Sequence, residues 1–453
     1  MKSVAVIGAG ITGLTAAFYL KRNGVAVTVY ETAERAGGVI RSARQNGFLA
    51  EFGPNSILET SPKIPRLISD LKLESRRLYP SAAAKNRYLV CRQQLVTVPS
   101  SQKDFLTTKL FSAKSKLSLL REPFLPARRD GKDESVAEFV RRRLNQEFLE
   151  RAVDALVAGI YAGDVEKLSV KQAFPKLFEV EQKFGSLIKG QLFGPGQRKE
   201  GEEVSRRDAK MFSFDEGLQV LTDKLRDELD DAIRFGISIE KISKTANGWT
   251  ISSRDFSAEH SAAIFCGNAY TLAKMQIESA QTVSTAIFSE IRYAPVASIV
   301  LGFRREDIAH PLDGFGMLIP KIEGRKILGT IFSSSLFPDR APQNFVTLTS
   351  YAGGERQPEL ASLAGERLLE LVLADLRELL GVNGKPQFQH VAFFPKAIPQ
   401  YNVGYEKFKS RLSEIEAQEP GLFFAGCYRN GVSLGDSIVS GRNVADNVLT
   451  FLR

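Results

Sequence analysis

Residues 4–31 read VAVIGAGITGLTAAFYLKRNGVAVTVYE, which predicts a β-strand, a glycine-rich turn, a helix and a second strand that ends at Glu31. The apolar run at its start suits a strand buried on both faces. In the turn, Gly8 allows a sharp reversal, Gly10 lets the backbone approach a pyrophosphate, and Gly13 lets the helix pack closely on the strand. The helix N-terminus offers free N–H groups to phosphates, and Glu31 can accept the hydroxyls of a ribose. This order of features predicts binding of an adenine dinucleotide with a free 2′-OH.

A second glycine pair follows in the segment Glu34-Arg35-Ala36-Gly37-Gly38-Val39-Ile40-Arg41. It lies where it can meet the same diphosphate and the flavin end of the cofactor, and NAD enzymes do not need this extension. The segment resembles the motif of the FAD-dependent amine oxidase superfamily. We therefore predict that the dinucleotide is FAD, with Gly37, Gly38 and Arg41 as contacts. The alternative for Arg41 is a solvated charge at a loop edge.

The composition is that of an ordinary folded protein, with 453 residues, 43% of them hydrophobic and 25% charged. This length is too great for one core and suits two or three domains. No apolar run approaches the roughly 20 residues of a membrane-spanning helix. The chain enters its first strand within three residues of Met1, which leaves no room for a signal peptide. We therefore expect a cytoplasmic protein.

Cysteine and histidine are too few and too scattered to predict a metal site, a disulfide framework or a hydrolase. The cysteines are Cys91, Cys266 and Cys427, and the histidines are His260, His310 and His390. The chemistry is therefore expected to come from the cofactor. Cys427 offers a covalent flavin link as an alternative, but we favour non-covalent FAD.

The C-terminal segment is predicted to complete the cofactor site. Residues 421–426 read GLFFAG, typical of a last buried strand and turn, and a helix is predicted over about 437–449. In the superfamily that the N-terminal motifs resemble, this strand and helix lie beside the flavin. The flavin neighbours that this resemblance implies are Gly426, Val432 and Ser433. A third piece, Ile237-Ser238-Ile239, is predicted as a strand that passes the adenine, with Ile239 as a backbone contact.

If residues near 1, 238 and 426 all contact one cofactor, the FAD-binding domain is built from separated stretches with other domains inserted between them. The predicted fold class is α/β, with a Rossmann-like FAD-binding domain, an inserted α+β substrate-binding domain and an inserted mostly helical domain. Their residues are 1–80, 206–270 and 415–453 for the first, 81–95 and 271–414 for the second, and 96–205 for the third. Helices are predicted over 103–120, 135–157 and 359–380, the second with a capping box of Ser135 and Glu138. Strands are predicted at 249–252, 299–303 and 345–351.

Six further motifs follow one another along the chain. They are EFGPNS at 51–56, KNRY at 85–88, GIYAGD at 159–164, FDEGLQVL at 214–221, GFGML at 314–318 and IPQY at 398–401. Together they resemble the oxygen-dependent protoporphyrinogen oxidases and the closely similar coproporphyrinogen III oxidases of bacteria, over nearly the whole chain. Gly53 of the first motif is taken as a further cofactor contact. Two alternatives stay open: another superfamily enzyme, such as an amine oxidase or carotenoid-type desaturase, and a non-catalytic FAD-binding scaffold.

The resemblance implies that six electrons leave a porphyrinogen in two-electron steps to FAD, while O2 regenerates the flavin and gives H2O2. Such a macrocycle needs apolar walls, cations for its propionates and a carbonyl for its pyrrole N–H groups. By resemblance, Gly159 lies at the ring centre and Arg87 pairs with a propionate. The apolar walls implied in the same way are Phe315, Leu318 and Ile331. Tyr351 stands where family members usually carry Phe or Met, so it adds a hydroxyl to an apolar wall.

Each of these positions has a simpler alternative, as a core side chain or, for Gly159, as a turn. Arg87 precedes Tyr88-Leu89-Val90, an apolar context in which an unpaired guanidinium would be costly. Lys85 mildly favours a more carboxylated substrate. No side chain is an obvious general base, so the protons are expected to leave to water or to the carbonyl at Gly159.

The net charge of +9 is compatible with an anionic partner but does not require one. Residues 103–132 hold eight Lys or Arg against three acids, interleaved with Phe and Leu. Basic and apolar residues together predict an amphipathic surface that contacts anionic lipid, with a solvated helix face as the alternative. Nucleic-acid binding is not expected, because no fold-level motif accompanies the charge. A homodimer is an expectation from the family.

Overall fold

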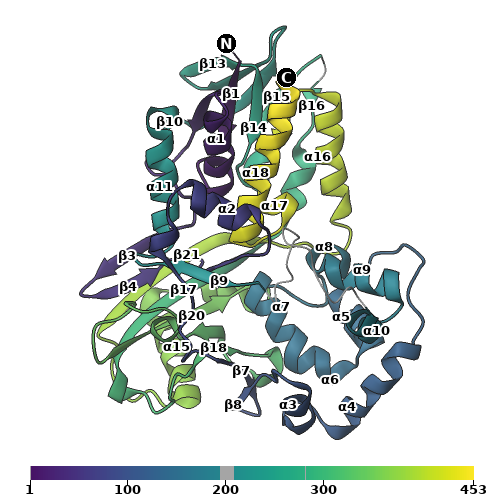
Figure 1. The fold of residues 1–453 in the computed structure, drawn as a ribbon, viewed down its shortest axis with the longest axis vertical. Helices are drawn as coiled ribbons and strands as arrows, with labels where there is room; N and C mark the ends of the chain where they lie inside the picture. The colour runs from purple at the N-terminus through teal and green to yellow at the C-terminus, as the bar shows by residue number, and fades with distance from the viewer. Residues whose placement is uncertain (1, 194–208, 281) are drawn as a thin grey trace.

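A five-stranded parallel sheet forms the upper part of the molecule (Figure 1) in the computed structural model, which describes residues 2–193, 209–280 and 282–453. The strand order is β10-β2-β1-β14-β22, and every pair is parallel. The strands are β1 (Ser3–Ile7), β2 (Ala26–Tyr30), β10 (Ile233–Arg234), β14 (Ala262–Phe265) and β22 (Leu422–Phe424). Segments far apart in the chain therefore build one Rossmann-like sheet, as predicted.

Helices cover this sheet on its long sides. They are α1 (Ile11–Arg22), α2 (Lys63–Asp70), α11 (Gln219–Leu229), α16 (Glu406–Gln418), α17 (Cys427–Asn430) and α18 (Leu434–Phe451). Helices α1 and α18 lie side by side (Figure 1), because Gly441 has no side chain and a Cβ there would overlap the carbonyl oxygen of Thr12. A second five-stranded sheet lies above it, made of β11 (Lys241–Lys244), β12 (Trp249–Ser253), β13 (Phe256–His260), β15 (Gln276–Glu278) and β16 (Thr282–Val283).

A seven-stranded sheet forms the lower left part of the molecule, in the order β21-β17-β20-β19-β18-β7-β8. The strands are β7 (Asn86–Cys91), β8 (Gln94–Thr97), β17 (Tyr293–Arg304), β18 (Gly314–Leu318), β19 (Ile327–Ile331), β20 (Phe345–Gly353) and β21 (Phe388–Pro399). Leu301, Met317 and Leu348 of one face form a buried core with Val372 and Leu376 of α15 (Gly365–Leu380). Side chains alternate along a strand, so their sequence neighbours point to the opposite face, which we call the inner face.

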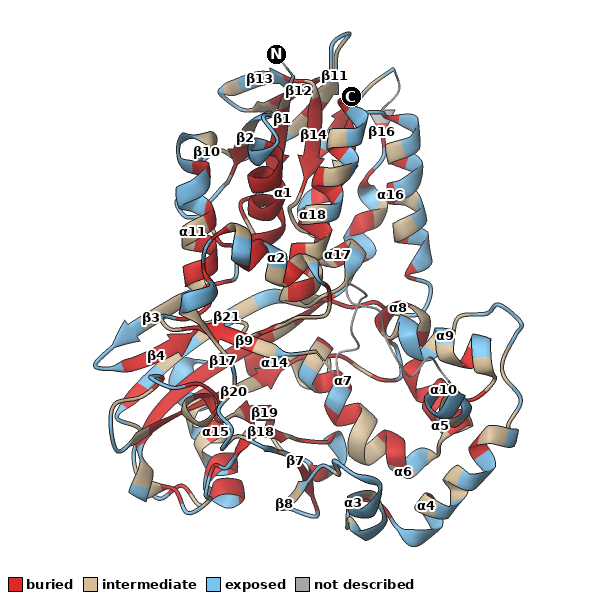
Figure 2. Cartoon of the chain, viewed as in Figure 1, coloured by how far each residue is buried: buried red, intermediate tan, exposed pale blue. Residues whose placement is uncertain are grey.

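The inner face is covered by elements from other parts of the chain. Phe48 of β4 (Phe48–Glu51) packs on Val300, and a Cβ on Gly302 would overlap the Phe48 ring. Ala158 and Ala162 join another apolar cluster on this side. The buried strands and inward helix faces are red in Figure 2. The remaining small strands are β3 (Ser42–Gln45), β5 (Ile57–Leu58), β6 (Arg77–Leu78) and β9 (Met211–Phe214), and the short helices are α12 (Ala269–Leu272), α13 (Ser333–Leu336) and α14 (Pro358–Ala361).

A helical lobe occupies the lower right of Figure 1. Its α-helices are α3 (Gln102–Thr107), α4 (Ala113–Ser118), α5 (Val136–Arg143), α6 (Gln146–Phe148), α7 (Asp154–Tyr161), α8 (Val170–Ala173), α9 (Pro175–Phe184) and α10 (Leu187–Phe193); a 3-10 turn η2 (Leu119–Phe124) and a π-helix η3 (Leu149–Val153) join them. The predicted domain boundary at 205/206 lies outside the described residues.

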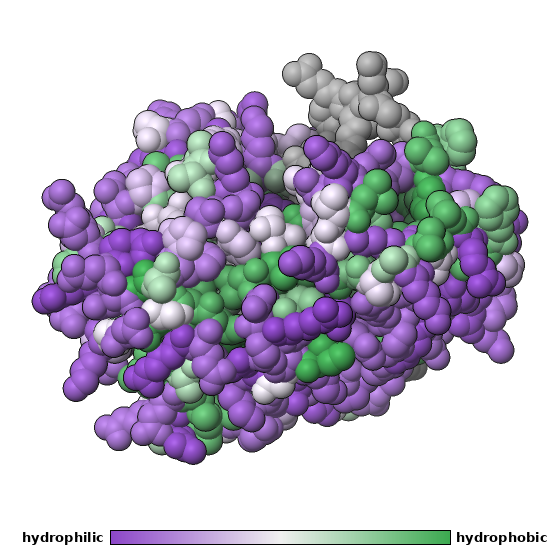
Figure 3. All heavy atoms as spheres, turned by 90° about the horizontal axis from the view of Figure 1, so that it is seen from below, coloured by the Kyte–Doolittle hydropathy of each residue, from purple (hydrophilic) through white to green (hydrophobic). Residues whose placement is uncertain are grey.

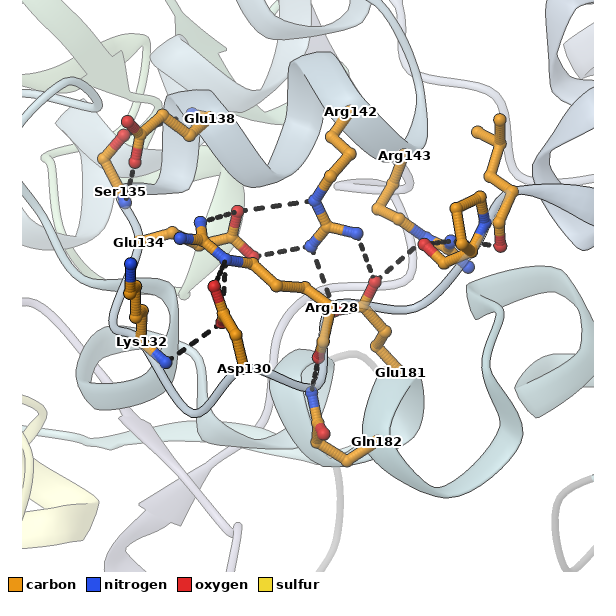
Figure 4. Close-up of polar contacts among 12 residues, drawn as sticks. Arg128, Asp130, Lys132, Glu134, Ser135, Glu138, Arg142, Arg143, Glu181 and Gln182 are labelled. Carbon is orange, nitrogen blue, oxygen red and sulfur yellow. Dashed lines mark hydrogen bonds and ion pairs between the residues drawn. The ribbon is translucent and has the colours of Figure 1, made fainter.

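A buried ion network holds this lobe together (Figure 4). Arg142 of α5 bonds both Glu134 and Glu181, and the fully buried Arg143 pairs with Glu181 at 3.4 Å. Arg143 also pairs with Glu122 at 2.5 Å. Breaking such a network by removing one partner leaves an uncompensated buried charge. It therefore fixes how α5 and α9 pack on each other and on the segment 122–134 that precedes α5.

Local capping moves several predicted helix ends. The helix predicted over 103–120 is interrupted: α3 ends at Thr107, and Ser112 caps the new helix α4 by accepting the N–H of Ser115. The predicted helix over 135–157 begins with the expected capping box of Ser135 and Glu138 but breaks at Asn145, whose side chain accepts the N–H of Phe148.

Two other helix starts also differ from the prediction. The helix predicted from 359 is interrupted, and α15 begins at Gly365. The last helix begins at Leu434, three residues earlier than predicted, because Ser433 and Asp436 form a capping box. Residues 237–239, predicted as a strand, form no regular strand. The strands predicted at 249–252, 299–303 and 345–351 are confirmed within β12, β17 and β20.

Candidate functional site

The carboxyl ends of β1, β14 and β22 meet at one edge of the parallel sheet, and the glycine-rich turn lies there. Gly8 has φ +107°, and a Cβ on Gly13 would overlap the Gly8 carbonyl oxygen, so both need glycine. Gly10 caps α1, and the space beside its Cα is open. The turn thus leaves room in front of the α1 N-terminus, where backbone N–H groups and the helix dipole favour a diphosphate.

Glu31 directly follows β2 at the same edge. Its carboxylate accepts the N–H of Ala9 at 2.7 Å and that of Ala33 at 2.9 Å. Two carboxylate oxygens offer about four acceptor positions, so two remain for ribose hydroxyls. The backbone N–H of Ile237 donates to the Glu31 carbonyl at 3.0 Å, which brings the segment with the buried Ile239 close to Glu31. The glycine-rich turn, the α1 N-terminus and Glu31 are together called the cradle.

The second glycine pair meets the first turn. Gly37 donates its N–H to the Ala9 carbonyl at 2.8 Å, and a Cβ on Gly38 would lie 3.3 Å from the Gly10 Cα. Arg35, which sequence reasoning did not single out, donates to the carbonyls of Ala36, Gly38 and Ile40 and so holds this loop closed. The signal for it was a cation two positions before Gly37, with Ala36 between them.

Arg41 lies over an aromatic pair. Its guanidinium carbon is 4.8 Å from the centre of the Phe52 ring, which stacks on His390 at 3.7 Å. Arg41 is exposed, and its guanidinium makes no hydrogen bond or ion pair with the residues that the structure describes. It is therefore free to meet a cofactor group. Burial and the Arg41 charge lower the pKa of His390, so this ring is neutral at pH 7.

The C-terminal segment reaches the same edge. Gly426 has φ +133° and donates its N–H to Ser440 at 3.1 Å, while Val432 and Ser433 lead into α18. The hydroxyl of Tyr401, from the IPQY motif, donates to the Cys427 carbonyl and accepts the Gly431 N–H at 2.9 Å. Burial raises the pKa of the Cys427 thiol to about 11, so this thiol is protonated at pH 7.

The structure adds Tyr270 and Lys396 to this edge. Tyr270 follows β14, its hydroxyl accepts a hydrogen bond from Asn268 at 2.8 Å, and the Lys396 ammonium lies 4.5 Å from the centre of its ring. No pattern in the sequence pairs these two residues, because they are more than a hundred positions apart.

Below the cradle, four of the six predicted substrate contacts share the inner face of the seven-stranded sheet. Leu318 lies opposite Gly329, which lies opposite Tyr351, and Ile331 continues β19 on the same face. On β7, Tyr88 and Val90 belong to the core under α15. Arg87 directly precedes Tyr88, so by alternation its side chain points to the opposite, inner face. Phe315 is half-buried and lies within the irregular stretch between Gly314 and Met317, where the register with β7 shifts, so alternation does not put it in this row.

Gly159, the fifth of these contacts, lies on α7 against this wall. A Cβ on Gly159 would lie 2.7 Å from the Leu318 Cδ2. Helix α7 ends because Ala162 adopts a left-handed conformation with φ +46°. Consequently the carbonyl oxygen of Gly159 accepts no hydrogen bond from any described residue, whereas those of Ala158 and Tyr161 do. An acceptor at the negative end of a helix suits N–H donors.

The hydroxyl of Tyr351 is not free in the apolar wall. It donates to the Gly53 carbonyl at 3.0 Å and accepts a hydrogen bond from the Asn55 side chain. Burial raises the pKa of Tyr351 well above its usual value. A Cβ on Gly53 would lie 3.0 Å from the Val39 carbonyl oxygen, so this loop also packs on the second glycine loop. Tyr351 thus connects the inner face to the two glycine loops.

Arg87 is exposed, and the premise that its guanidinium lies in an apolar surround is wrong. The apolar residues after it, Tyr88 to Val90, are buried, but Arg87 itself is solvent-exposed, and its guanidinium has no hydrogen-bond or ion-pair partner among the described residues. An exposed guanidinium keeps its hydration and needs no partner for stability. Its position at the rim of the inner face leaves it available for an anionic ligand.

Comparison with known proteins agrees with this geometry. The model of the family described as flavin containing amine oxidoreductase matches residues 11–449. The chain belongs to this family. It is therefore a flavin-dependent oxidoreductase, and the cradle of glycines, α1 N-terminus and Glu31 fits FAD.

The chain is also similar, over its whole length, to curated proteins. It is 35% identical to protoporphyrinogen oxidase 2 of Arabidopsis thaliana over 484 residues, covering 100% of this chain and 94% of the plant protein. It is 28% identical to coproporphyrinogen III oxidase of Bacillus subtilis, covering 100% of this chain and 98% of that protein.

Solved structures share the fold. A crystal structure from an Exiguobacterium species, provisionally named a protoporphyrinogen oxidase, superposes with a TM-score of 0.82 at 22% identity, covering 99% of this chain and 98% of that chain. Cyclohexylamine oxidase from Brevibacterium oxydans gives 0.75 at 16% identity, covering 100% and 99%. At these identities the likeness concerns the fold alone.

Proposed function

We propose that this protein oxidises a porphyrinogen to a porphyrin with FAD as electron acceptor. The observation that carries the proposal is the unpartnered Gly159 carbonyl at the C-terminus of α7, directly beside Leu318 on the inner face. A reduced tetrapyrrole presents pyrrole N–H donors at its centre and apolar faces around them, and this arrangement is complementary to both. The full-length similarity to proteins named protoporphyrinogen and coproporphyrinogen III oxidases supports the same substrate class.

Each group of residues has a separate task in this proposal. Bound FAD supplies a two-electron acceptor that O2 reoxidises, so that a six-electron oxidation takes three rounds. Gly159 orients the macrocycle by accepting its N–H groups. Phe315, Leu318 and Ile331 exclude water from its faces, and Arg87 pairs with a propionate at the rim. Protons leave from the pyrrole nitrogens to water or through the Gly159 carbonyl oxygen.

The proposed division of the chain follows from these tasks. In this division the FAD-binding domain, which holds FAD without a covalent bond, consists of residues 1–80, 206–270 and 415–453. The substrate-binding domain consists of residues 81–95 and 271–414. The helical domain consists of residues 96–205. The cofactor contacts in this proposal are Gly8, Gly10, Gly13, Glu31, Gly37, Gly38, Arg41, Gly53, Ile239, Gly426, Val432 and Ser433. A homodimer is part of the proposal, and sedimentation equilibrium tests it.

Anaerobic reduction of the bound flavin tests the proposed function. Coproporphyrinogen III and protoporphyrinogen IX are added separately to the FAD-bound protein, and the flavin absorbance is followed. At least one of them should bleach the flavin absorbance at least as fast as the steady-state turnover of that substrate. Readmission of O2 should restore the absorbance with release of H2O2. If neither does so while an amine or a carotenoid precursor does, the proposed substrate class is wrong.

We also propose that the helical lobe contacts an anionic membrane surface. Large apolar side chains are exposed on neighbouring elements of this lobe: Leu117 on α4, Leu120 and Phe124 on η2, and Leu192 and Phe193 on α10. Apolar atoms gather on this side of the molecule in Figure 3. Among the described residues, no helix is long and apolar enough to cross a bilayer. Exposed apolar side chains beside a run of cations suit a surface contact.

Co-sedimentation with vesicles tests the membrane proposal. Binding should rise with the fraction of anionic lipid, fall with salt, and fall further in Leu120→Ser/Phe124→Ser. Phe393→Ser, an exposed apolar side chain on β21, is the matched control and should bind like the parent protein. Binding that ignores lipid charge and salt would exclude this contact.

A further inference from the structure

The N-terminus of α7 is held by a buried ion pair that no sequence motif predicted. Asp154, the first residue of α7, pairs with Arg356 at 2.6 Å, and the exposed fractions of the two side chains are 9% and 7%. The same carboxylate accepts the backbone N–H of Lys321 at 2.7 Å. Three segments that are distant in the sequence therefore meet at this point.

Arg356 connects α7 to the strand that carries Leu318. Its guanidinium donates to the Ile319 carbonyl at 2.8 Å and to the Asp154 carbonyl at 2.7 Å. Its chain neighbour Glu355 donates its backbone N–H to the Ala162 carbonyl at 2.7 Å, just beyond the other end of α7. The loop after β20 thus bonds to both ends of α7, the helix on which Gly159 lies.

These bonds matter for the rotation of α7 about its axis because a π-helix directly precedes it. A π turn is wider than an α turn, and it is found mostly as a single inserted turn. If η3 (Leu149–Val153) returned to α geometry, α7 would rotate by about 100°, the angle between successive residues. Gly159 would then leave Leu318. Burying an ion pair does not by itself stabilise a fold over an apolar pair of similar size. In this protein the pair can form with these partners in only one register of α7, because Asp154 and Arg356 also bond Lys321 and Ile319.

We propose that Asp154 and Arg356 are positioning residues, which hold the Gly159 carbonyl at its distance from the Leu318 wall and so set the rate at which a bound porphyrinogen reduces the flavin. This inference rests on the proposed function. The pair contacts neither substrate nor cofactor and acts only through α7.

The opposite face of the same sheet offers a matched control. Arg325 pairs with Asp375 of α15 at 3.5 Å, with side chains 13% and 7% exposed. Asp375 also accepts backbone N–H groups, from Lys326 at 2.7 Å and Ile327 at 3.1 Å. This pair has similar chemistry and burial, with Glu378 of α15 as a second partner of Arg325, but it attaches α15, which lies away from Gly159.

The test compares Asp154→Asn, Arg356→Met and Arg356→Lys with Asp375→Asn and Arg325→Met, all as FAD-bound proteins. The measurements are the midpoint of thermal unfolding, the flavin midpoint potential, the rate of flavin reoxidation by O2, and the anaerobic rate of flavin reduction by coproporphyrinogen III or protoporphyrinogen IX. We expect Asp154→Asn and Arg356→Met to slow reduction at saturating substrate by tenfold or more, with reoxidation rate and potential unchanged. Arg356→Lys should recover part of the rate, and the two controls should lose stability but reduce within twofold of the parent.

The outcomes separate this inference from the proposed function. If the parent protein is reduced by neither porphyrinogen, the proposed function fails first. If the parent is reduced and the Asp154 and Arg356 variants behave like the controls, the positioning role is wrong. If all three variants at these positions lose folded, FAD-bound protein, the pair holds the fold as a whole and the inference is also wrong.

Discussion

Replacing Gly159 by alanine tests the candidate site with the smallest possible change. The added methyl group would lie 2.7 Å from the Leu318 Cδ2 and 3.3 Å from its Cδ1. Carbon atoms in contact prefer about 3.5–4.0 Å. Leu318 must therefore move by about 1 Å, and the methyl group takes space directly beside the inner face, where we propose that the macrocycle binds.

The stability of this variant should hardly change. Alanine favours a helix over glycine by about 1 kcal/mol. The end of the Leu318 side chain is flexible, and forcing it off its preferred rotamer costs about 0.5–1.5 kcal/mol. Because these terms oppose each other, the free energy of unfolding should stay within about 1 kcal/mol of the parent value.

Activity should change much more than stability. A displacement of about 1 Å in a reacting geometry can cost about a hundredfold in rate. We expect kcat/KM for the better porphyrinogen to fall by about 10–100-fold in Gly159→Ala, with FAD content unchanged. Gly159→Val should abolish turnover and still bind FAD.

Two further variants complete the assay. Gly365→Ala places the same substitution at the start of α15, where a Cβ meets nothing within 4 Å, and should leave activity unchanged. Leu318→Ala in the Gly159→Ala background shows whether displacement of Leu318 causes the loss. Normal steady-state turnover of both porphyrinogens by Gly159→Ala would refute the placement of the macrocycle beside α7.

Three other perturbations probe the residues around this site. Glu31→Ala removes the acceptor of two backbone N–H groups, so FAD affinity measured by calorimetry should fall by about 10–100-fold, the equivalent of 1.5–3 kcal/mol for charge-assisted bonds; an unchanged Kd would contradict the role of this carboxylate. Tyr351→Phe removes the hydroxyl that bonds Gly53 and Asn55, and should lower the free energy of unfolding in urea by about 1–2 kcal/mol while KM stays constant; a changed KM at constant stability would mean that the hydroxyl faces the substrate. Burial raises the pKa of Glu51 to about 7, so the folded state keeps a proton that the unfolded chain releases from about pH 4.5 upward. Stability should therefore fall as the pH rises from about 4.5 to 7, by up to about 3 kcal/mol, and Glu51→Gln should flatten this slope; equal slopes for the two proteins in denaturation curves would disprove it.

The sequence alone predicts those features of this protein that depend on residues close together in the chain. The glycines at 8, 10 and 13 and the acid at 31 predict the cradle, because the turn, the helix start and the strand end are neighbours in the chain. The capping box at Ser135 is equally local and is confirmed. Helix ends that depend on weaker caps, such as those at Ser112 and Asn145, were not predicted, since a polar side chain competes there with a strong helix pattern.

Tertiary structure decided what the distant parts of the chain do to one another. The inner face, the contact of Gly159 with Leu318 and the bond from Tyr351 to Gly53 join residues more than a hundred positions apart. Local propensity and periodicity say nothing of such pairs, because strand order and register depend on the packing of the whole sheet. The exposure of Arg87 and the buried pair of Asp154 and Arg356 are of the same kind: each follows from which face of an element is covered, and only the assembled fold determines that.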